Sequence, residues 1–285
     1  MSDTTLPRTA PRPFFNKRRR TLLVIGLGTF ILLGIFFWGI ALSPESYGPN
    51  YSARRLAPCW AHLFGTDNLG RDMFYRTIAG MSLSIRIGLL SAGISSLIAL
   101  VLGTLSAVFG GWVDTVVNYL VDLCMGVPHL ILLILISIAM GGGAAGVITG
   151  VAVTHWPSLT RLLRAEVMQL RASPYVQLSR RFGHGPVYIA VKHILPHIFP
   201  QFVVGLVLLF PHLILHEASI TFLGYGLPLD TPAMGVILAE SMKYLATGMW
   251  WLAFFPGLVL LIASQLFDVV GEYLKTLIDP YSSRD

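Results

Sequence analysis

The stretch TLLVIGLGTFILLGIFFWGIALS, from Thr21 to Ser43, contains no charged residue. About 20 apolar residues in an α-helix cross the roughly 30 Å hydrocarbon core of a bilayer, so the stretch predicts a membrane-spanning helix. The apolar core of a cleaved secretory signal is shorter, about 7–15 residues, and a small-residue cleavage site follows it. No convincing cleavage site follows Ser43. We therefore predict that this helix remains in the protein as its first span.

The composition of the whole chain agrees with a membrane protein. Hydrophobic residues make up 54% of it and charged residues 12%, whereas soluble domains carry about 25% charged residues. The net charge of +6 is also found in nucleic-acid-binding proteins. Here, however, the basic residues lie at the ends of apolar segments, where they orient membrane helices. We therefore expect a lipid bilayer, and no nucleic acid, as a partner.

Five further apolar segments predict an all-α membrane protein with six transmembrane helices. After residues 21–43, the expected spans are 81–109, 113–140, 146–159, 197–223 and 250–270. Residues 1–20 and 271–285 are expected as polar tails, 44–80 as an external loop, and 161–192 as a cytoplasmic loop inside a five-helix core, 81–270. Lysine and arginine are concentrated in the tails and in the 161–192 loop. The positive-inside rule then places both termini in the cytoplasm.

The sequence contains no catalytic or cofactor-binding motif. The dipeptide Lys275-Thr276 comes nearest to a phosphate-binding P-loop, but it lacks the preceding glycines. Cys59 falls in the expected external loop and Cys124 in an expected span, so neither a disulfide between them nor a zinc site is predicted. We expect a protein that is not an enzyme and binds no cofactor. If ATP drives its function, ATP and magnesium bind to partner subunits.

A basic stretch between the fourth and fifth expected spans reads LRAEVMQLRASPYVQLSRRFGHGPVYIAVKHILP, from Leu163 to Pro196. It breaks at Ser173-Pro174 and continues as a short helix-like piece, Tyr175 to Phe182. Gly183 and Gly185-Pro186 end that piece, as glycine and proline do at helix ends. A short helix held by turns at both ends is a rigid knob for a soluble partner. A solvated basic loop that only orients the protein is the other interpretation, and the residues alone leave both open.

The same stretch resembles the coupling loop of binding-protein-dependent ABC importers, whose pattern is E-A-A-x-x-x-G followed by I-x-L-P. Gly183 stands at the glycine of this pattern, and Ile194-Leu195-Pro196 closes it. Gln177-Leu178-Ser179 replaces E-A-A, which is a departure from the pattern. The resemblance implies ATPase coupling through Tyr175, Val176, Gln177, Leu178, Ser179, Arg180, Gly183, Leu195 and Pro196.

Further segments resemble the dipeptide, oligopeptide and nickel permeases. They are FGTDNLGRDMFYRTIAG (64–80), GGWVD (110–114) with Asp122 and Pro128, HEASITFLGYG (216–226), and FFPGLVLLI (254–262) with FDVVGEYLKTLIDP (267–280). Together they cover nearly the whole chain after about residue 60. The chain is similar to the C-type permease subunit of this family. The nickel branch is favoured by the H-x-x-x-H spacing at His212 and His216 and by His155-Trp156.

The resemblance implies the type I ABC importer permease fold in a bacterial inner membrane. It also implies a second homologous permease subunit, two cytoplasmic ATP-binding subunits and an external solute-binding protein. The expected function is alternating-access import of nickel, a metal chelate or a short peptide, powered by the ATPase subunits.

Ionisable side chains at membrane depth are costly and usually face the bundle interior or a wet cavity. His212 and His216 are four residues apart, so they share one helical face and can share a ligand, whereas Glu217 lies about 100° further round. The ionisable candidates at membrane depth are Asp122, His129, His155, His193, His197, His212, His216 and Glu217. Of these, the candidate translocation residues are Asp122, His155, His212, His216 and Glu217. Two interpretations stay open: the histidines bond to neighbouring helices or the partner, or they line a path for a metal complex. No residue is firmly assigned as a metal ligand.

Other polar and small residues have structural interpretations. Asp114 and Asp122 are expected to pair with arginines or backbone groups, and Gly103, Gly110 and Gly111 to permit close helix contact. Two other classes of function are alternatives. A secondary transporter driven by an ion gradient predicts internal repeats and broken intramembrane helices, but the sequence shows no repeat. A receptor or scaffold leaves the polar residues at membrane depth without a purpose.

Overall fold

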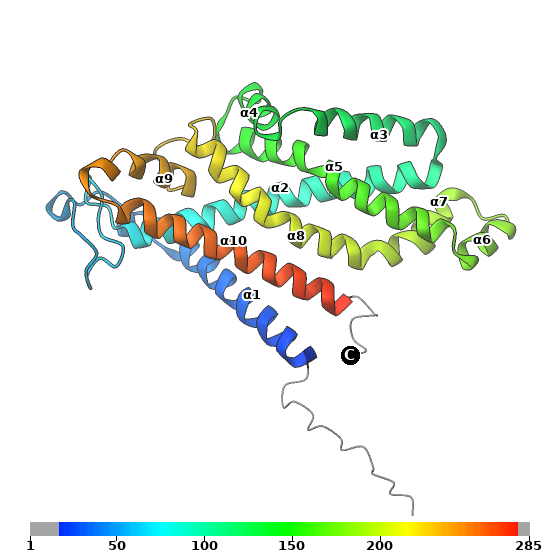
Figure 1. Ribbon diagram of the computed structural model, residues 1–285, viewed down its shortest axis with the longest axis horizontal. Coiled ribbons are helices and arrows are strands. Elements are labelled where there is room, and N and C mark those ends of the chain that lie inside the picture. The colour runs from blue at the N-terminus through cyan, green and yellow to red at the C-terminus, as the bar shows by residue number, and fades with distance from the viewer. Residues whose placement is uncertain (1–16, 279–285) are drawn as a thin grey trace, which may run out of the picture.

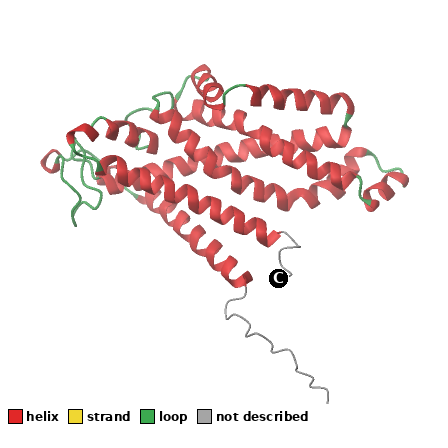
Figure 2. Cartoon of the chain, viewed as in Figure 1, coloured by secondary structure: helices red, strands yellow, loops and turns green. Residues whose placement is uncertain are grey.

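A computed structural model describes residues 17–278 of the chain. Within that range the chain forms helices joined by loops, and it contains no β-strand (Figure 2). The all-α class is therefore confirmed. Of the two expected tails, residues 1–16 and 279–285 lie outside the described part, whereas 17–20 and 271–278 are helical.

The main helices differ in how well they are suited to cross a membrane. Four described helices are long and apolar enough: α1 (Lys17–Ala41), α2 (Met73–Phe109), the continuous run from α7 (Pro186–Ile189) to α8 (Leu195–Phe222), and α10 (Trp251–Ile278). A fifth candidate is the pair α3 (Gly111–Gly126) and α4 (His129–Ala139), bent by 98°. By length and composition the described residues thus give four or five spans. This is compatible with six, and six stays a prediction.

Several boundaries differ from those expected. Residues 73–80 of the expected external loop belong to α2, and residues 161–171 belong to α5 (Gly143–Arg171) instead of a loop. The expected third span, 113–140, is broken at Val127-Pro128. Proline has no backbone N–H, and it disfavours the helical conformation of the residue before it. A continuous span was therefore the wrong expectation there.

Figure 1 shows how the helices are arranged. Helices α2, α5 and α8 run along the length of the molecule, and α10 and α1 lie beside them. Helix α9 (Met234–Met242) and the loop 42–72 form one end, while α6 (Pro174–Arg181) and α7 form the other. The start of α1 and the end of α10 lie near each other, away from α9. This arrangement places both ends of the described chain on the same side as α6.

Glycines allow the central helices to approach closely. A Cβ atom at Gly103 of α2 would lie 3.1 Å from the Thr160 carbonyl oxygen and 3.2 Å from the Leu163 Cβ of α5. On α5, a Cβ atom at Gly146 would lie 2.6 Å from the Ser137 carbonyl oxygen of α4, and one at Gly150 would lie 3.0 Å from the Leu133 carbonyl oxygen. Small residues four apart are the usual device for close helix contact in membranes. The close contact expected at Gly103 is therefore confirmed.

Gly110 and Gly111 have a different role from the expected one. Their φ angles are 65° and 51°, and a Cβ at either would meet no atom closer than 3.9 Å. They form the left-handed turn between α2 and α3, for which glycine is favoured. The expectation of close helix contact at these two positions was wrong.

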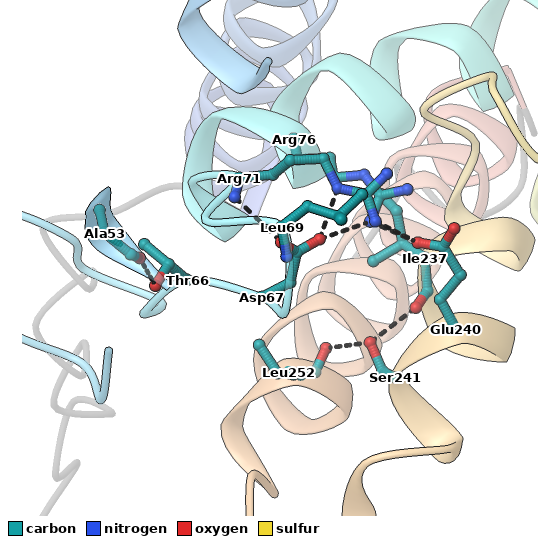
Figure 3. Close-up of polar contacts among 10 residues, drawn as sticks. All are labelled: Ala53, Thr66, Asp67, Leu69, Arg71, Arg76, Ile237, Glu240, Ser241 and Leu252. Atoms are coloured by element: carbon teal, nitrogen blue, oxygen red, sulfur yellow. Dashed lines mark hydrogen bonds and ion pairs between the residues drawn. The ribbon is translucent and has the colours of Figure 1, made fainter. Parts of the chain in front are cut away.

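Two arginines and two carboxylates attach the loop 42–72 to α9 (Figure 3). Arg71 Nε contacts Asp67 Oδ2 at 2.5 Å, and Arg71 Nη2 contacts Glu240 Oε2 at 2.7 Å. Arg76 Nη1 lies 2.7 Å from Glu240 Oε2 and 3.4 Å from Asp67 Oδ2. The Arg76 side chain is only 4% exposed, and a buried charge needs such partners. The four formal charges cancel.

The helix packing at Gly103 can be tested with a matched pair of variants. We expect Gly103→Val to destabilise the protein by about 1–3 kcal/mol, the usual cost of overpacking. Gly93→Val is the control, because Gly93 is an exposed glycine of the same helix with open space around it. The measurement is thermal unfolding of the purified protein in detergent. Equal midpoints for the two variants would contradict the close packing of α2 on α5.

The charge cluster gives a second stability prediction. We expect Glu240→Ala to cost about 3 kcal/mol, the low end for removing one partner of a buried ion pair, because Asp67 still faces Arg76. The exposed carboxylate Glu45 provides the control variant, Glu45→Ala. Adding Arg76→Met to Glu240→Ala should recover part of the loss, since no buried charge is then left without its partner. Strictly additive losses in this double-mutant cycle would count against the pairing.

Candidate functional site

The short helix α6 lies at the end of the molecule away from α9 (Figure 1). It begins at Pro174, whose fixed φ suits the first helical position. It ends before Gly183, which has a φ of 84°, and there His184 N–H donates to the Ser179 carbonyl at 3.3 Å. A left-handed glycine is the common way to end a helix. The short helix predicted at 175–182 is therefore confirmed to within one residue.

Two faces of α6 have different surroundings. Val176 is 0% exposed and Ser179 is 7% exposed, so both face inward. Tyr175, Leu178 and Phe182 are 43%, 52% and 74% exposed. Their spacing of three and four residues puts them on one side of the helix. Three apolar side chains that solvent can reach, next to the exposed Arg180 and Arg181, form an unpartnered surface. We call Tyr175, Leu178 and Phe182 the outer face of α6.

Contacts with the long helices hold α6 in place. Val176 packs into a buried cluster with residues of α2, α5, α7, the π-helical turn that follows α7, and α8: Ala107, Val108, Val167, Leu170, Ile189, Ile194 and Ile198. Arg171, the last residue of α5, donates to the Ala107 carbonyl of α2. Gln177 Nε2 donates to the Ala172 carbonyl at 3.0 Å. The knob therefore has a fixed position on the end of α5.

The other predicted coupling residues, Leu195 and Pro196, lie outside the knob. They open α8, directly after a π-helical turn at Ala190–Ile194. Leu195 is half-buried against the cluster that holds Val176, and Pro196 is exposed. The structure therefore divides the predicted set: Tyr175 to Arg180 lie on α6, Gly183 ends it, and Leu195 and Pro196 belong to the next helix.

Two aspartates of α3 pair with arginines of α5, as expected. Arg164 Nε and Nη2 donate to the two carboxylate oxygens of Asp114 at 2.6 and 2.7 Å. Such bidentate pairs are among the stronger charge-assisted hydrogen bonds. Asp122 Oδ1 accepts from Arg161 Nη2 at 2.6 Å. The Asp122 side chain is 68% exposed, so this second pair lies on the surface of the described chain.

A cavity of about 700 Å³ opens at the break between α3 and α4. Its walls come from the break and from α4, α5 and α8, and they include His129, His155, His212 and His216. Three of the predicted translocation residues, His155, His212 and His216, are therefore brought together. We call this space the histidine pocket.

The remaining predicted translocation residues lie elsewhere. Glu217 is 0% exposed, and its carboxylate accepts from Ser84 Oγ at 2.6 Å and Thr221 Oγ1 at 3.0 Å. It faces the interior between α2 and α8 and does not line the pocket. Asp122 also lies outside the pocket lining, in its surface pair with Arg161.

His129 completes the pocket; the sequence placed it among the ionisable residues at membrane depth but not among the translocation residues. It is the first residue of α4, directly after Pro128. The 98° bend at this proline turns α4 back towards α5 and α8. The ring centre of His129 lies 4.4 Å from that of His155 and 4.6 Å from that of His216. The available signal was the Val127-Pro128 dipeptide in an apolar segment, which predicts a helix boundary.

Solved structures of two ABC transporters share this fold. The MetNI methionine ABC transporter in an inward-facing conformation matches with a TM-score of 0.58 at 20% identity, over 73% of this chain and 98% of that one. An amino acid ABC transporter matches with a TM-score of 0.54 at 14% identity, over 71% and 92%. At such identities the likeness concerns the fold alone.

Sequence relatives are closer. The dipeptide transport system permease protein DppC of Bacillus subtilis is 32% identical over 89% of this chain and 80% of its own length. A putative peptide transport system permease protein of Brucella suis is 33% identical over 92% and 88%. The nickel branch favoured by the sequence finds no support in these relatives, which are named as peptide permeases.

The family model described as binding-protein-dependent transport system inner membrane component matches residues 99–280, from the middle of α2 to beyond the end of α10. This match covers more than half of the chain, and the peptide permeases above extend it towards the N-terminus. The chain therefore belongs to the binding-protein-dependent transport system inner membrane components, and it is a permease subunit of an ABC importer.

Proposed function

We propose that this subunit forms part of a translocation pathway for short peptides and that partner ATPases drive it through α6. The outer face of α6 carries the proposal for ATPase coupling. It presents Tyr175, Leu178 and Phe182 to solvent, while Val176 fixes the same helix to the bundle. An apolar helix face with a buried anchor suits a groove on a soluble partner. The expected partners are two ATP-binding subunits, which carry the ATP and magnesium, and a second permease subunit.

The connection between α6 and α5 explains how force reaches the pathway. Helix α5 is continuous from Gly143 to Arg171 and is followed by α6 after only two residues. It lines the histidine pocket at His155 and Pro157. A displacement of α6 therefore moves a wall of this pocket, and packed helices change between discrete arrangements instead of deforming continuously. Alternating access follows from such a movement.

The charge distribution supports α6 as the cytoplasmic end. Exposed Arg180, Arg181 and Lys192 lie there, and the start of α1 with Arg19 and Arg20 lies on the same side (Figure 1). At the opposite end, Arg71 and Arg76 are neutralised by carboxylates. By the positive-inside rule, this distribution supports a cytoplasmic location for both ends of the described chain. The α9 end would then face an external solute-binding protein.

Peptides are the cargo that the relatives support, since permeases 32–33% identical to this chain are named for dipeptides or peptides. The break between α3 and α4 is a feature that we expected of a secondary transporter. Family membership nevertheless supports the ATP-driven mechanism. A broken helix pair is compatible with both classes of transporter, because irregular backbone is tolerated at membrane depth where it lines a cavity.

The outer face of α6 can be tested by adding one negative charge at two positions. We expect Leu178→Glu to lower co-purification with the ATPase subunits and ATP-dependent uptake by about tenfold or more, because a central apolar contact at an interface contributes 2 kcal/mol or more. Gln169→Glu is the matched control: it adds the same charge at an exposed residue of α5, close in sequence to α6 but outside the predicted coupling residues. Uptake is measured in proteoliposomes. Coupling that survives Leu178→Glu would contradict the docking role.

The cargo is tested by comparing two labelled solutes in the same proteoliposomes with the solute-binding protein present. We expect ATP-dependent uptake of a labelled dipeptide that neither added nickel nor a metal chelator changes. Saturable nickel uptake in the absence of peptide would overturn the peptide assignment. The α6 variants are measured separately, by their association with the ATPase subunits. Nickel uptake would therefore overturn the peptide assignment without contradicting the coupling proposal.

A further inference from the structure

Three imidazoles in the histidine pocket have no part in ATPase coupling. His129 of α4, His155 of α5 and His216 of α8 each offer a ring nitrogen, and these nitrogens lie within 4.8 Å of one another. The three ring centres are 4.4 to 5.0 Å apart. The three residues come from three different helices, so the periodicity of one helix does not bring them together. We call His129, His155 and His216 the histidine trio.

The hydrogen bonds of His155 prepare it as a ligand. Its Nδ1 lies 2.8 Å from the Val151 carbonyl oxygen. A carbonyl only accepts, so Nδ1 carries the hydrogen and Nε2 keeps its lone pair. Metal-binding histidines characteristically donate the other ring N–H to a carbonyl or carboxylate in this way, which fixes the ring. Thr154 Oγ1, 3.1 Å from Nδ1, lies on the same side of the ring.

The lone pair of His155 has no protein partner. His155 is 8% exposed, and its Nε2 is buried without a hydrogen bond to any described residue. His129 Nε2 is likewise buried without a hydrogen bond to any described residue. Buried polar atoms in native proteins are nearly always satisfied. Two unsatisfied ring nitrogens on residues that line one cavity therefore call for a partner, either a hydrogen-bonding group or a metal ion.

The geometry points to a binding site for a divalent first-row transition-metal ion, such as zinc, nickel or copper, held by His129, His155 and His216. Imidazole suits these metals, while magnesium and calcium prefer oxygen ligands. Nitrogens bound at about 2.0–2.1 Å in a tetrahedral arrangement lie about 3.3 Å apart. From separations of at most 4.8 Å, the rings need to close by about 1.5 Å or less. Small side-chain rotations provide such a movement.

Three protein ligands leave the fourth position of a tetrahedral ion open towards the pocket. Open positions are typical of zinc sites that bind an exchangeable ligand. The three imidazoles are neutral when they bind, so the ion keeps its double positive charge in a largely apolar setting. An anionic fourth ligand, hydroxide or a carboxylate, offsets this charge. The nearby carboxylate of Glu217 is committed to Ser84 and Thr221, so the anion comes from the cavity.

The test uses the intact transporter, purified through a tag without histidines and stripped of metal with a chelator. We expect one Cu²⁺ or Zn²⁺ per copy of this subunit in addition to any metal bound elsewhere in the complex. His129→Gln, His155→Gln and His216→Gln should each weaken this binding by at least about tenfold. Pulsed EPR of Cu²⁺ bound to the wild-type complex should show nitrogen couplings from several imidazoles. This measurement does not depend on whether the variants fold.

A matched control separates the trio from other histidines. His197→Gln changes an exposed histidine of α8 outside the pocket and should leave binding unchanged. His212→Gln should have a much smaller effect than His155→Gln, because His212 lines the pocket but does not belong to the trio. Metal binding that depends on His212 and His216 but not on His129 or His155 would overturn the proposal. So would unchanged binding in all three trio variants, or no site in the wild-type complex.

Discussion

The close contact between α2 and α5 supports the rest of the structure. In a bilayer, apolar helices gain little from leaving lipid for each other, so van der Waals packing must hold them together. Gly103 provides the necessary approach on α2, and Gly146 and Gly150 do so where α5 meets α4. Helix α5 is thereby fixed on two sides. It is the helix from which α6 extends and on which His155 lies, so both candidate sites depend on its position.

Charged groups support this packing near both ends of the bundle. Arg164 and Asp114 hold the start of α3 against α5 near α6, and Arg71 and Arg76 with Asp67 and Glu240 hold the loop against α9. Buried ion pairs add little net stability but are costly to break. Their effect is therefore to fix one arrangement of these ends. A subunit that transmits force needs such fixed ends, because a compliant end would absorb the displacement.

Sequence analysis predicted the elements that depend on local signals. The ends of α6 follow from Pro174 and Gly183, and the pairing of Asp114 follows from the cost of a charge at membrane depth. The break at Val127-Pro128 was missed, since both halves are apolar and hydropathy does not distinguish a bent span from a straight one. The sequence indicates helix-forming content up to Arg171 but not that this helix continues the preceding span. The structure extends α5 through residues 161–171, and Arg164 within them is paired with a neighbouring helix.

Residues that are distant in sequence meet in the histidine pocket, which is why composition and spacing identified only part of it. The pair His212 and His216 is visible as a helical repeat, whereas His129 and His155 join them only after the bend of α4. The position of the trio also has a mechanical consequence. His155 lies on α5, which leads directly to α6, and His216 lies on α8, which reaches the same end through the π-helical turn at 190–194. His129 lies beyond the break, on α4. In the proposed metal site, a movement of α6 relative to α4 would change the separations of the three imidazoles, so that metal affinity and the conformational state of the transporter would depend on each other reciprocally.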